Sequence, residues 1–174
     1  MNADIVIRDA IEADADVVQA IYAHHVLHGT ASYDIEPPAV DVMRGKIRDV
    51  GQAGWPFIVA EVEGDVAGYA YATQFRDREA YRFTAEDSIY VHPARTGRGV
   101  GKTLLKALLE RSAECGFRTI VAVIGGAEPA SIAVHAALGF EEVGRLKSVG
   151  RKKERWLDSV YMQIMLGSEE MGAG

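Results

Sequence analysis

A glycine-rich loop is the feature of this 174-residue sequence that points most directly to chemistry. It reads Thr96-Gly-Arg-Gly-Val-Gly-Lys-Thr103 and lies between a predicted strand and a long amphipathic helix that contains Leu104 and Leu108. The first N–H groups of a helix have no partner within it, and together with the helix dipole they bind anions. Glycine permits left-handed backbone and the close approach of a phosphate. With Arg95, Arg98 and Lys102 adding positive charge, the loop predicts a phosphate site.

Three phosphate-binding patterns compete for this loop, and none of them fits completely. The Walker A pattern G-x-x-x-x-G-K-[ST] matches Gly101-Lys102-Thr103 at its end but has Thr96 at its first glycine. The dinucleotide pattern G-x-G-x-x-G fails because Lys102 stands at its last glycine. A two-glycine pattern, [Q/R]-x-x-G-x-[G/A], fits Gly99 and Gly101 but begins at Thr96. The loop alone indicates phosphate without a family, and a turn that merely caps a core helix remains the alternative.

Composition narrows the class of protein. Hydrophobic residues make up 48% and charged residues 25%, as in an ordinary globular chain. The net charge of -6 argues against nucleic acid or an anionic membrane as a partner. No apolar run approaches the roughly 18 residues of a membrane span, and the first residues lack a signal-peptide layout. A single cysteine, Cys115, fits a reducing compartment, so we expect a cytoplasmic protein.

Hydrophobic periodicity predicts the elements that position the loop. Strands are predicted at 5–7, 57–62, 66–72, 88–91, 119–124 and 159–166, with another from Glu141, and the turn at 63–65 makes a hairpin. Helices are predicted at 17–26 after Asp14 as N-cap, at 40–50, from the glycine loop to about Gly116, and at 131–138. This order predicts an α/β (α+β) fold, with one mixed, mostly antiparallel sheet and helices on both faces. We expect a single domain over residues 1–166 and a disordered tail at 167–174.

Several sequence blocks, taken together in order, resemble a known family. They are Tyr81–Val91, the glycine loop, Val121–Gly125 and His135–Phe140. They closely resemble the phosphinothricin and methionine-sulfoximine N-acetyltransferases, a branch of the GNAT superfamily, and the resemblance runs from about residue 7 to residue 166. It implies the GNAT fold, acetyl-CoA as co-substrate, and acetyl transfer to the primary amine of a small amino-acid-like molecule. It also implies a homodimer.

The resemblance implies which residues hold acetyl-CoA. Ile89, Tyr90 and Val91 would pair with the pantetheine arm through free backbone groups, and one N–H would polarise the acetyl carbonyl. The pyrophosphate would be bound by the loop residues Thr96, Gly97, Arg98, Gly99, Val100, Gly101 and Lys102. Two positions depart from the family pattern. Thr96 replaces a Gln or Arg, and Glu128 stands where many relatives carry an asparagine that contacts the cofactor.

Two residues are the candidate catalytic groups. Glu86 is the candidate base, because its partly apolar surroundings are expected to raise its pKa toward the working range. His135 stands where many GNAT enzymes have a tyrosine that protonates the departing thiolate, and the resemblance implies an acid/base or orienting role for it. The alternatives are an exposed carboxylate for Glu86 and a structural histidine for His135.

An amino-acid substrate carries a carboxylate, which predicts an arginine beside it. Five residues align with the substrate region of the family, together with Glu86, and they are Phe75, Arg76, Asp77, Tyr81 and Arg82. Arg76 and Arg82 are the preferred clamp. Tyr33 is a candidate lid over the substrate, with core packing as its alternative.

Other chemistries are disfavoured by the sequence. His24 and His28 share a helical face but lack a third ligand at a recognisable spacing, so we expect no metal. Cys115 lacks an adjacent base, so direct attack in a ternary complex is preferred over an acyl-cysteine route. The competing functions are acetylation of another amine (a protein N-terminus, a polyamine or an aminoglycoside), a non-catalytic acetyl-CoA sensor, and a P-loop hydrolase.

Overall fold

The computed structural model describes residues 4–167, which contain one seven-stranded sheet in the order β1-β2-β3-β4-β5-β7-β6. The strands are β1 (Ile5–Asp9), β2 (Phe57–Val62), β3 (Asp65–Gln74), β4 (Thr84–Val91), β5 (Thr119–Gly125), β6 (Glu141–Lys152) and β7 (Arg155–Met165). Every neighbouring pair is antiparallel except β4 and β5, which run parallel. The predicted mixed, mostly antiparallel sheet is therefore confirmed.

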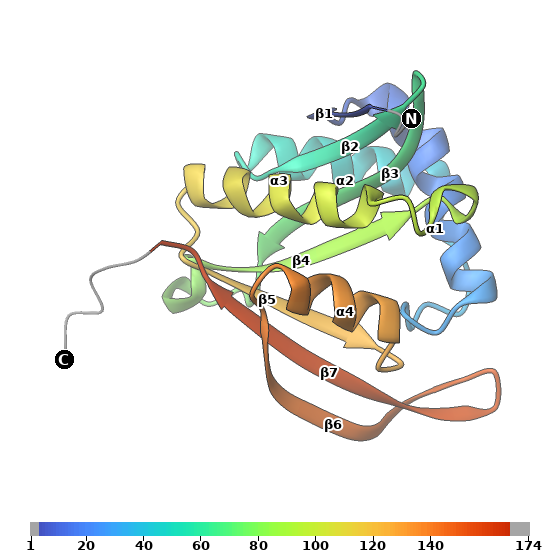
Figure 1. The fold of residues 1–174 in the computed structure, drawn as a ribbon, viewed down its shortest axis with the longest axis vertical. Coiled ribbons are helices and arrows are strands. Elements are labelled where there is room, and N and C mark those ends of the chain that lie inside the picture. Colours follow the sequence, from blue (N-terminus) through green and yellow to red (C-terminus); the bar gives the residue numbers. More distant parts are fainter. Residues whose placement is uncertain (1–3, 168–174) are drawn as a thin grey trace.

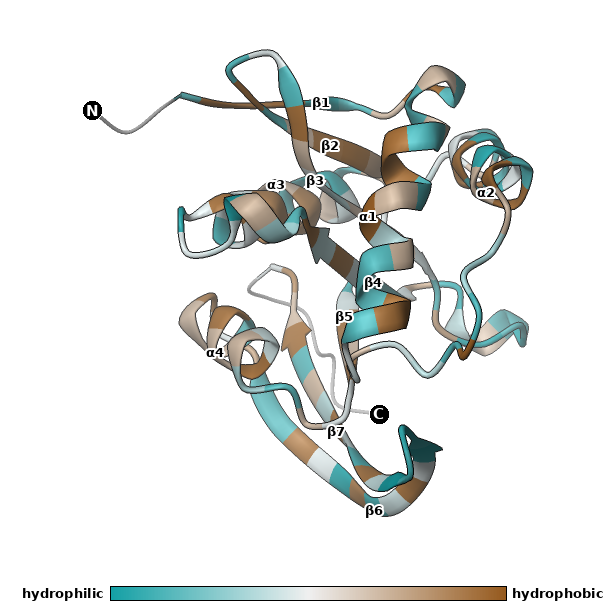
Figure 2. Ribbon diagram, turned by 90° about the vertical axis from the view of Figure 1, so that its right-hand side faces the viewer, coloured by the Kyte–Doolittle hydropathy of each residue, from teal (hydrophilic) through white to brown (hydrophobic). Residues whose placement is uncertain are grey.

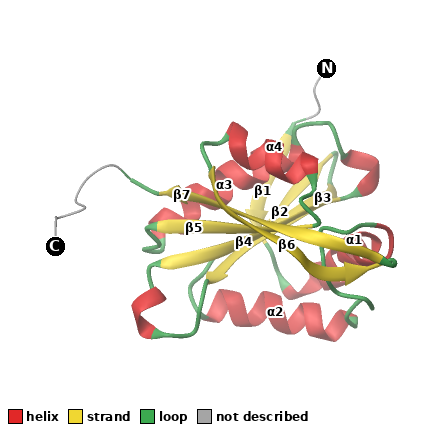
Figure 3. Cartoon of the chain, turned by 90° about the horizontal axis from the view of Figure 1, so that it is seen from below, coloured by secondary structure: helices red, strands yellow, loops and turns green. Residues whose placement is uncertain are grey.

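Helices cover both faces of this sheet (Figures 1 and 3). On one face, α1 (Ala15–His28) and α2 (Val40–Gln52) share a core with the inner residues of β2 and β3. On the other, α3 (Val100–Glu114) and α4 (Pro129–Ala137) pack on a second core. Short 3-10 turns lie at Glu12–Asp14, Glu79–Tyr81 and Pro93–Arg95. Within residues 4–167, no helix combines the length and apolar character that a membrane crossing requires. Most of the predicted tail, residues 168–174, lies outside the described residues.

Local sequence explains two of these elements. The hairpin between β2 and β3 turns at Glu63 and Gly64, whose φ angles of 57° and 86° are those of a two-residue turn with a positive φ at both positions. The first turns of α3 bury Leu104 and Leu108 completely, as expected for residues four apart on an amphipathic helix.

The start of α1 differs in detail from the prediction. Asp14 occupies the N-cap position, but its side chain does not cap α1. Its carboxylate turns back and accepts hydrogen bonds from the Ile11 N–H (2.8 Å) and from the Arg8 guanidinium (2.8 and 2.9 Å). The buried charge is thus satisfied by β1 and by the short turn that precedes the helix.

β4 and β5 part from each other within the sheet. β4 pairs with β3 along its whole length, but with β5 only over Thr84–Glu86. Both strands continue beyond that point, β4 to Val91 and β5 to Gly125. The sheet therefore has an internal gap between two of its central strands, and this gap positions the site described below.

The loop between α1 and α2, residues 29–39, packs tightly on glycines at the ends of β5 and β6. A Cβ atom at Gly125 would lie 2.5 Å from the Ala31 carbonyl oxygen. A Cβ atom at Gly150 would lie 2.7 Å from the ring of Tyr33. Both distances are shorter than a van der Waals contact, so the loop can occupy this place only because these positions lack side chains.

Hydrogen bonds from both β6 and β7 hold the same loop. The Lys152 ammonium is buried and donates to the Ser32 carbonyl oxygen at 2.7 Å. Burial, with a smaller contribution from the charge of Lys153, lowers the pKa of Lys152. The Tyr33 hydroxyl donates to the Asp158 carbonyl oxygen at 2.9 Å.

We expect the Gly125→Ala substitution to displace this loop. The new Cβ must push the Ala31 carbonyl away, which should cost about 1–3 kcal/mol in the free energy of unfolding, measured by urea titration. Gly144→Ala is the matched control, because Gly144 also lies in a strand but has nothing within 4 Å of its Cβ position. Equal stability of the two variants would contradict the tight packing of the loop.

Candidate active site

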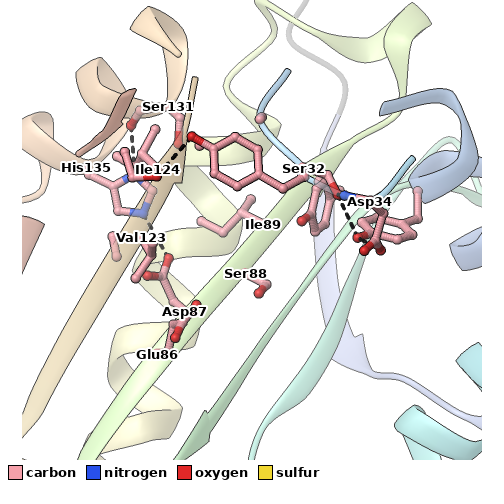
Figure 4. Close-up of a pocket in the computed structure, with 17 residues that line it drawn as sticks. Ser32, Asp34, Glu86, Asp87, Ser88, Ile89, Val123, Ile124, Ser131 and His135 are labelled. Carbon is pink, nitrogen blue, oxygen red and sulfur yellow. Dashed lines mark hydrogen bonds and ion pairs between the residues drawn. The ribbon is translucent and has the colours of Figure 1, made fainter. Parts of the chain in front are cut away.

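A cavity of about 280 Å³ opens where β4 and β5 part (Figure 4). Its walls come from the α1–α2 loop, β4, β5, α4 and single residues of α1 and β7. The titratable side chains that line it are Tyr22, Tyr33, Asp34, Glu86, Asp87, Tyr90 and His135. Groups from distant parts of the sequence are thus gathered around one small space.

Side chains of β4 alternate between the two faces of the sheet, so the strand divides the cavity into two sides. Tyr90 packs with the core under α1 and α2, which places Glu86 and Ser88 on that same face. Ile89 packs with the core under α3 and α4, which places Asp87 on the opposite face. The carboxylates of Glu86 and Asp87, which are adjacent in the sequence, therefore lie on opposite faces of the sheet.

Glu86 is a half-buried carboxylate on the α1/α2 side. Burial raises its pKa, the charge of Asp87 raises it further, and the Arg76 guanidinium partly opposes the rise. The shift has the direction that the sequence predicts for this residue. A carboxylate with a raised pKa in a cavity is suited to accept a proton near neutral pH.

The His135 ring is buried between two acceptors on the α3/α4 side, as Figure 4 shows. Its Nδ1 lies 2.7 Å from the Ser131 carbonyl oxygen, and its Nε2 lies 2.8 Å from Asp87 Oδ2. The ring of Phe140 meets the imidazole edge-on, with centroids 4.9 Å apart. Burial lowers the pKa of His135, but the hydrogen bond and charge of Asp87, with the Ser131 carbonyl, outweigh it and leave the pKa raised.

Hydroxyl groups line the α1/α2 side of the cavity. The Tyr22 hydroxyl donates to Asp34 Oδ2 at 2.5 Å and shares a hydrogen bond with Ser32 Oγ at 2.8 Å. Burial and the bond to Asp34 raise the pKa of Tyr22 to about 12. Tyr33, the predicted lid residue, also lines the cavity, and its hydroxyl lies 2.9 Å from Ser159 Oγ. This side offers several hydrogen-bond partners to a polar ligand.

Backbone groups of β4 face the gap at alternate residues. The hydrogen bonds from the Phe75 N–H to the Thr84 oxygen and from the His92 N–H to the Ala67 oxygen show that even-numbered residues of β4 bond to β3. The backbone N–H and C=O groups of Tyr90 therefore bond to β3. Of residues 89–91, Ile89 and Val91 point their N–H and C=O groups into the gap.

The Val91 carbonyl oxygen has one partner across this gap. His25 of α1 lies with its Nε2 2.8 Å from that oxygen, which makes this imidazole nitrogen the donor. His25 was not predicted from the sequence as a residue of the site.

The glycine loop forms the N-terminus of α3 outside the cavity lining. Gly97 and Gly99 have φ angles of 71° and 82°, which favour glycine, and Gly99 is the N-cap of the helix. The side chains of Arg98 and Lys102 are exposed there. Val100 is buried under the loop. The local geometry is that of an anion-binding helix start.

Two side chains at the start of this loop already have partners within the protein. Thr96 Oγ1 donates to the Pro93 carbonyl oxygen at 3.2 Å. Arg95 forms an ion pair with Glu63 at 3.2 Å. Arg98 and Lys102 are therefore the better placed cations for an anion at this helix end.

Glu128, the other residue that departs from the family pattern, is the N-cap of α4. Its carboxylate accepts a hydrogen bond from the Ser131 N–H at 2.7 Å. The negative charge is stabilised by the helix N-terminus and helps to fix the turn of α4 that carries Ser131.

Glu86 and Tyr33 line the cavity, but the other predicted substrate residues lie on the connection between β3 and β4 and are not part of its lining, namely Phe75, Arg76, Asp77, Tyr81 and Arg82. The Arg76 guanidinium lies over the Phe75 ring, 4.5 Å from its centroid, and Phe75 meets Tyr81 edge-on. Arg82 lies over Phe83 and pairs with Glu79, whereas Asp77 is exposed. Arg76 still acts on the cavity, because its charge lowers the pKa of Glu86.

Asp87 is the principal site residue that sequence reasoning missed. It follows Glu86 directly, and strand alternation alone indicates that it faces the other side of the sheet. Its contact with His135 spans 48 positions, and no local pattern predicts it. The cavity residues Ser32, Asp34 and Ser159 were missed for the same reason.

Two further observations concern chemistries considered from the sequence. Within residues 4–167, no group of three or more His, Cys, Asp and Glu side chains is arranged to hold a metal ion. Cys115 is exposed just beyond the end of α3 and is absent from the cavity lining.

Comparison with known proteins agrees with this geometry. The Acetyltransferase (GNAT) family matches residues 19–140. The chain is 48% identical to a phosphinothricin N-acetyltransferase of Alcaligenes faecalis, covering 93% of this chain and 83% of the relative. It is 38% identical to an L-methionine sulfoximine/L-methionine sulfone acetyltransferase of Salmonella typhimurium, covering 92% and 94%.

A solved structure is similar over nearly the whole chain. It is a GNAT superfamily phosphinothricin acetyltransferase from Sinorhizobium meliloti in complex with AcCoA, with a TM-score of 0.92 and 46% identity, covering 99% of this chain and 95% of that one. The parted central strands, the glycine-capped helix and these similarities agree, and the chain belongs to the GNAT acetyltransferase family.

Proposed function

We propose that the protein transfers the acetyl group of acetyl-CoA to the primary amine of a small amino-acid-like substrate of the phosphinothricin, methionine sulfoximine or methionine sulfone type. The observation that carries the proposal is the cavity at the β4–β5 gap, which has a carboxylate with a raised pKa on one side of the sheet and the Asp87–His135 pair on the other. The activities named for the similar proteins support the substrate class.

The residues present fit acetyl-CoA. The N–H and C=O groups of Ile89 and the N–H group of Val91 suit the amides of a pantetheine arm, which would add to the open strand edge, whereas the Val91 C=O is already bound by His25. The helix start at Gly97–Lys102 suits a diphosphate. When bound, acetyl-CoA supplies the acetyl group as an activated thioester.

Glu86 is the proposed base. It removes a proton from the substrate ammonium, so that the nitrogen can bond to the acetyl carbon as the C–S bond breaks. The nitrogen loses a second proton when the amide forms, and the sulfur gains one proton, so that coenzyme A leaves as the thiol. The amine reaches Glu86 from the α1/α2 side, among the hydroxyls of Tyr22, Ser32 and Tyr33.

His135 is proposed to stabilise the departing sulfur from the opposite side of the sheet. Its protonated ring would stabilise the negative charge that develops as the thiolate leaves. Transfer is direct in a ternary complex, because the cysteine of this chain lies away from the cavity.

Recognition of a substrate carboxylate is assigned to Arg76, with Arg82 as the second candidate. On the α1/α2 side of the cavity, where the amine is proposed to bind, the acidic lining residues are Asp34 and Glu86, and His135 lies on the opposite side, so a substrate carboxylate needs a cation from beyond the lining. Arg76 supports this role because its charge already influences Glu86.

We further propose a cytoplasmic homodimer. β6 is an edge strand, and the β6–β7 hairpin exposes Val143, Leu146, Val149 and Trp156 by 47–66%. Figure 2 shows hydrophobic segments along β6 on this hairpin, which extends away from the helices. An exposed apolar edge of this kind favours contact with a second copy of the chain.

The Glu86→Gln substitution should lower kcat by about 10²–10⁴-fold and leave the affinity for acetyl-CoA unchanged. In the unmodified enzyme, activity should fall as the pH drops through the raised pKa of Glu86, above the ordinary value of about 4.3 for a glutamate. This acid limb should vanish in the variant. Glu110→Gln, an exposed site on α3, is the control. An unchanged pH–rate profile would mean that the base lies elsewhere.

The Gly99→Glu substitution should weaken acetyl-CoA binding by about 10–100-fold or more, measured by calorimetry, because a carboxylate would occupy the anion site. Gly64→Glu is the matched control, since Gly64 has a φ of 86° against 82° for Gly99 and neither has atoms near its Cβ position. Both variants carry the same backbone strain. Equal loss of affinity in both would contradict a site at α3.

Thiol release from acetyl-CoA tests the proposed function against a panel of amines. The panel contains methionine sulfoximine, methionine sulfone, phosphinothricin, spermidine, an aminoglycoside and a peptide with a free N-terminus. We expect turnover with one or more of the first three and little with the others. A preference for the polyamine, the aminoglycoside or the peptide would redirect the substrate class, and binding without turnover would indicate a sensor.

A further inference from the structure

Both ring nitrogens of His135 face groups that accept hydrogen bonds. The Ser131 carbonyl oxygen, at 2.7 Å from Nδ1, has no proton to donate, and Asp87 Oδ2, at 2.8 Å from Nε2, is a carboxylate oxygen. A neutral imidazole has one N–H and can satisfy only one of these acceptors. Both acceptors receive a hydrogen bond only when the ring carries a proton on each nitrogen and therefore a positive charge.

Asp87 is placed to hold that charge. The side chains of Asp87 and His135 are 1% and 5% exposed, so water screens the pair very little. The second oxygen of Asp87, Oδ1, is buried and has no hydrogen-bond partner among residues 4–167. The carboxylate therefore directs its interaction at one protein donor, His135 Nε2. The position of His135 in the last turn of α4 also favours a cation there.

We propose that Asp87 is a positioning residue that keeps His135 doubly protonated, so that a positive charge forms the α3/α4 wall of the cavity opposite Glu86. The proposal rests on the proposed function for its role in catalysis, where the cation would meet the developing thiolate. The double protonation of the His135 ring follows from its hydrogen-bond geometry and does not depend on the proposed function. Asp87 does not need to contact the substrate to act in this way.

Charges near the Asp87–His135 pair link its ionisation to that of Glu86, the proposed base. Glu86, on the other face of β4, has its pKa raised in part by Asp87, and Arg76 acts on Glu86 in the opposite sense. Glu128 on α4 is bound by the Ser131 N–H and does not contact the ring. Removal of the Asp87 charge should therefore move two ionisations, those of His135 and Glu86, toward lower pH together.

Nitrogen NMR of the imidazole side chains tests the state of the ring without any turnover. The chain has five histidines, and the His135 signals are assigned by their loss in His135→Gln. We expect both nitrogens of His135 to show the protonated form at pH 7.5 in the unmodified protein. In Asp87→Asn, which keeps the shape and an acceptor oxygen, the titration of His135 should fall by about 1–3 pH units. Asp65→Asn, an exposed aspartate at the start of β3, should leave it unchanged.

A neutral His135 at pH 7.5 in the unmodified protein would overturn the proposal, as would an unchanged titration in a folded Asp87→Asn variant. With a substrate from the amine panel, Asp87→Asn should also shift the whole pH–kcat profile to lower pH, whereas a purely structural role would lower kcat equally at every pH. Failure of the amine panel with a protonated His135 would refute the function and leave the role of Asp87 on the ring intact.

Discussion

After Glu86, β4 has a sheet partner on one edge only, and the organisation of the site depends on that constraint. Unpaired backbone groups in the middle of a sheet are costly unless something else bonds to them. In this chain Ile89 and Val91 point backbone groups into the gap, and His25 bonds to one of them, the Val91 carbonyl oxygen. Because side chains alternate along a strand, Glu86 faces α1 and α2 while Asp87 faces α3 and α4, and both line the cavity that opens at the gap.

One continuous segment connects this open edge with the anion site. β4 ends at Val91, the chain makes a short turn over Pro93–Arg95, and the glycines then begin α3. A ligand with an amide arm and a diphosphate could bind along this segment without any rearrangement of the sheet. The buried Asp87–His135 pair is costly in return, because a paired ion in the interior contributes little to stability after desolvation.

The sequence was sufficient to predict the helices and strands and the residues that belong to local sequence motifs. Periodic apolar residues predicted the helices and strands, and the glycine loop predicted the start of α3. Glu86 and His135 were found through ordered blocks that resemble a family. The pairing of His135 with Asp87, the capping role of Glu128 and the exclusion of Arg82 from the cavity could not be found in this way, because each depends on contacts or packing that only the tertiary fold creates.

Residue-resolved amide hydrogen exchange with and without acetyl-CoA tests the central claim most directly. If the open edge of β4 receives the acyl donor, the amides of Ile89 and Val91, which have no strand partner on that side, should exchange rapidly in the free protein and become protected on binding. The amides of Gly97–Gly101 should be protected in the same titration. Protection of the glycine loop without any change at Ile89 and Val91 would contradict the account.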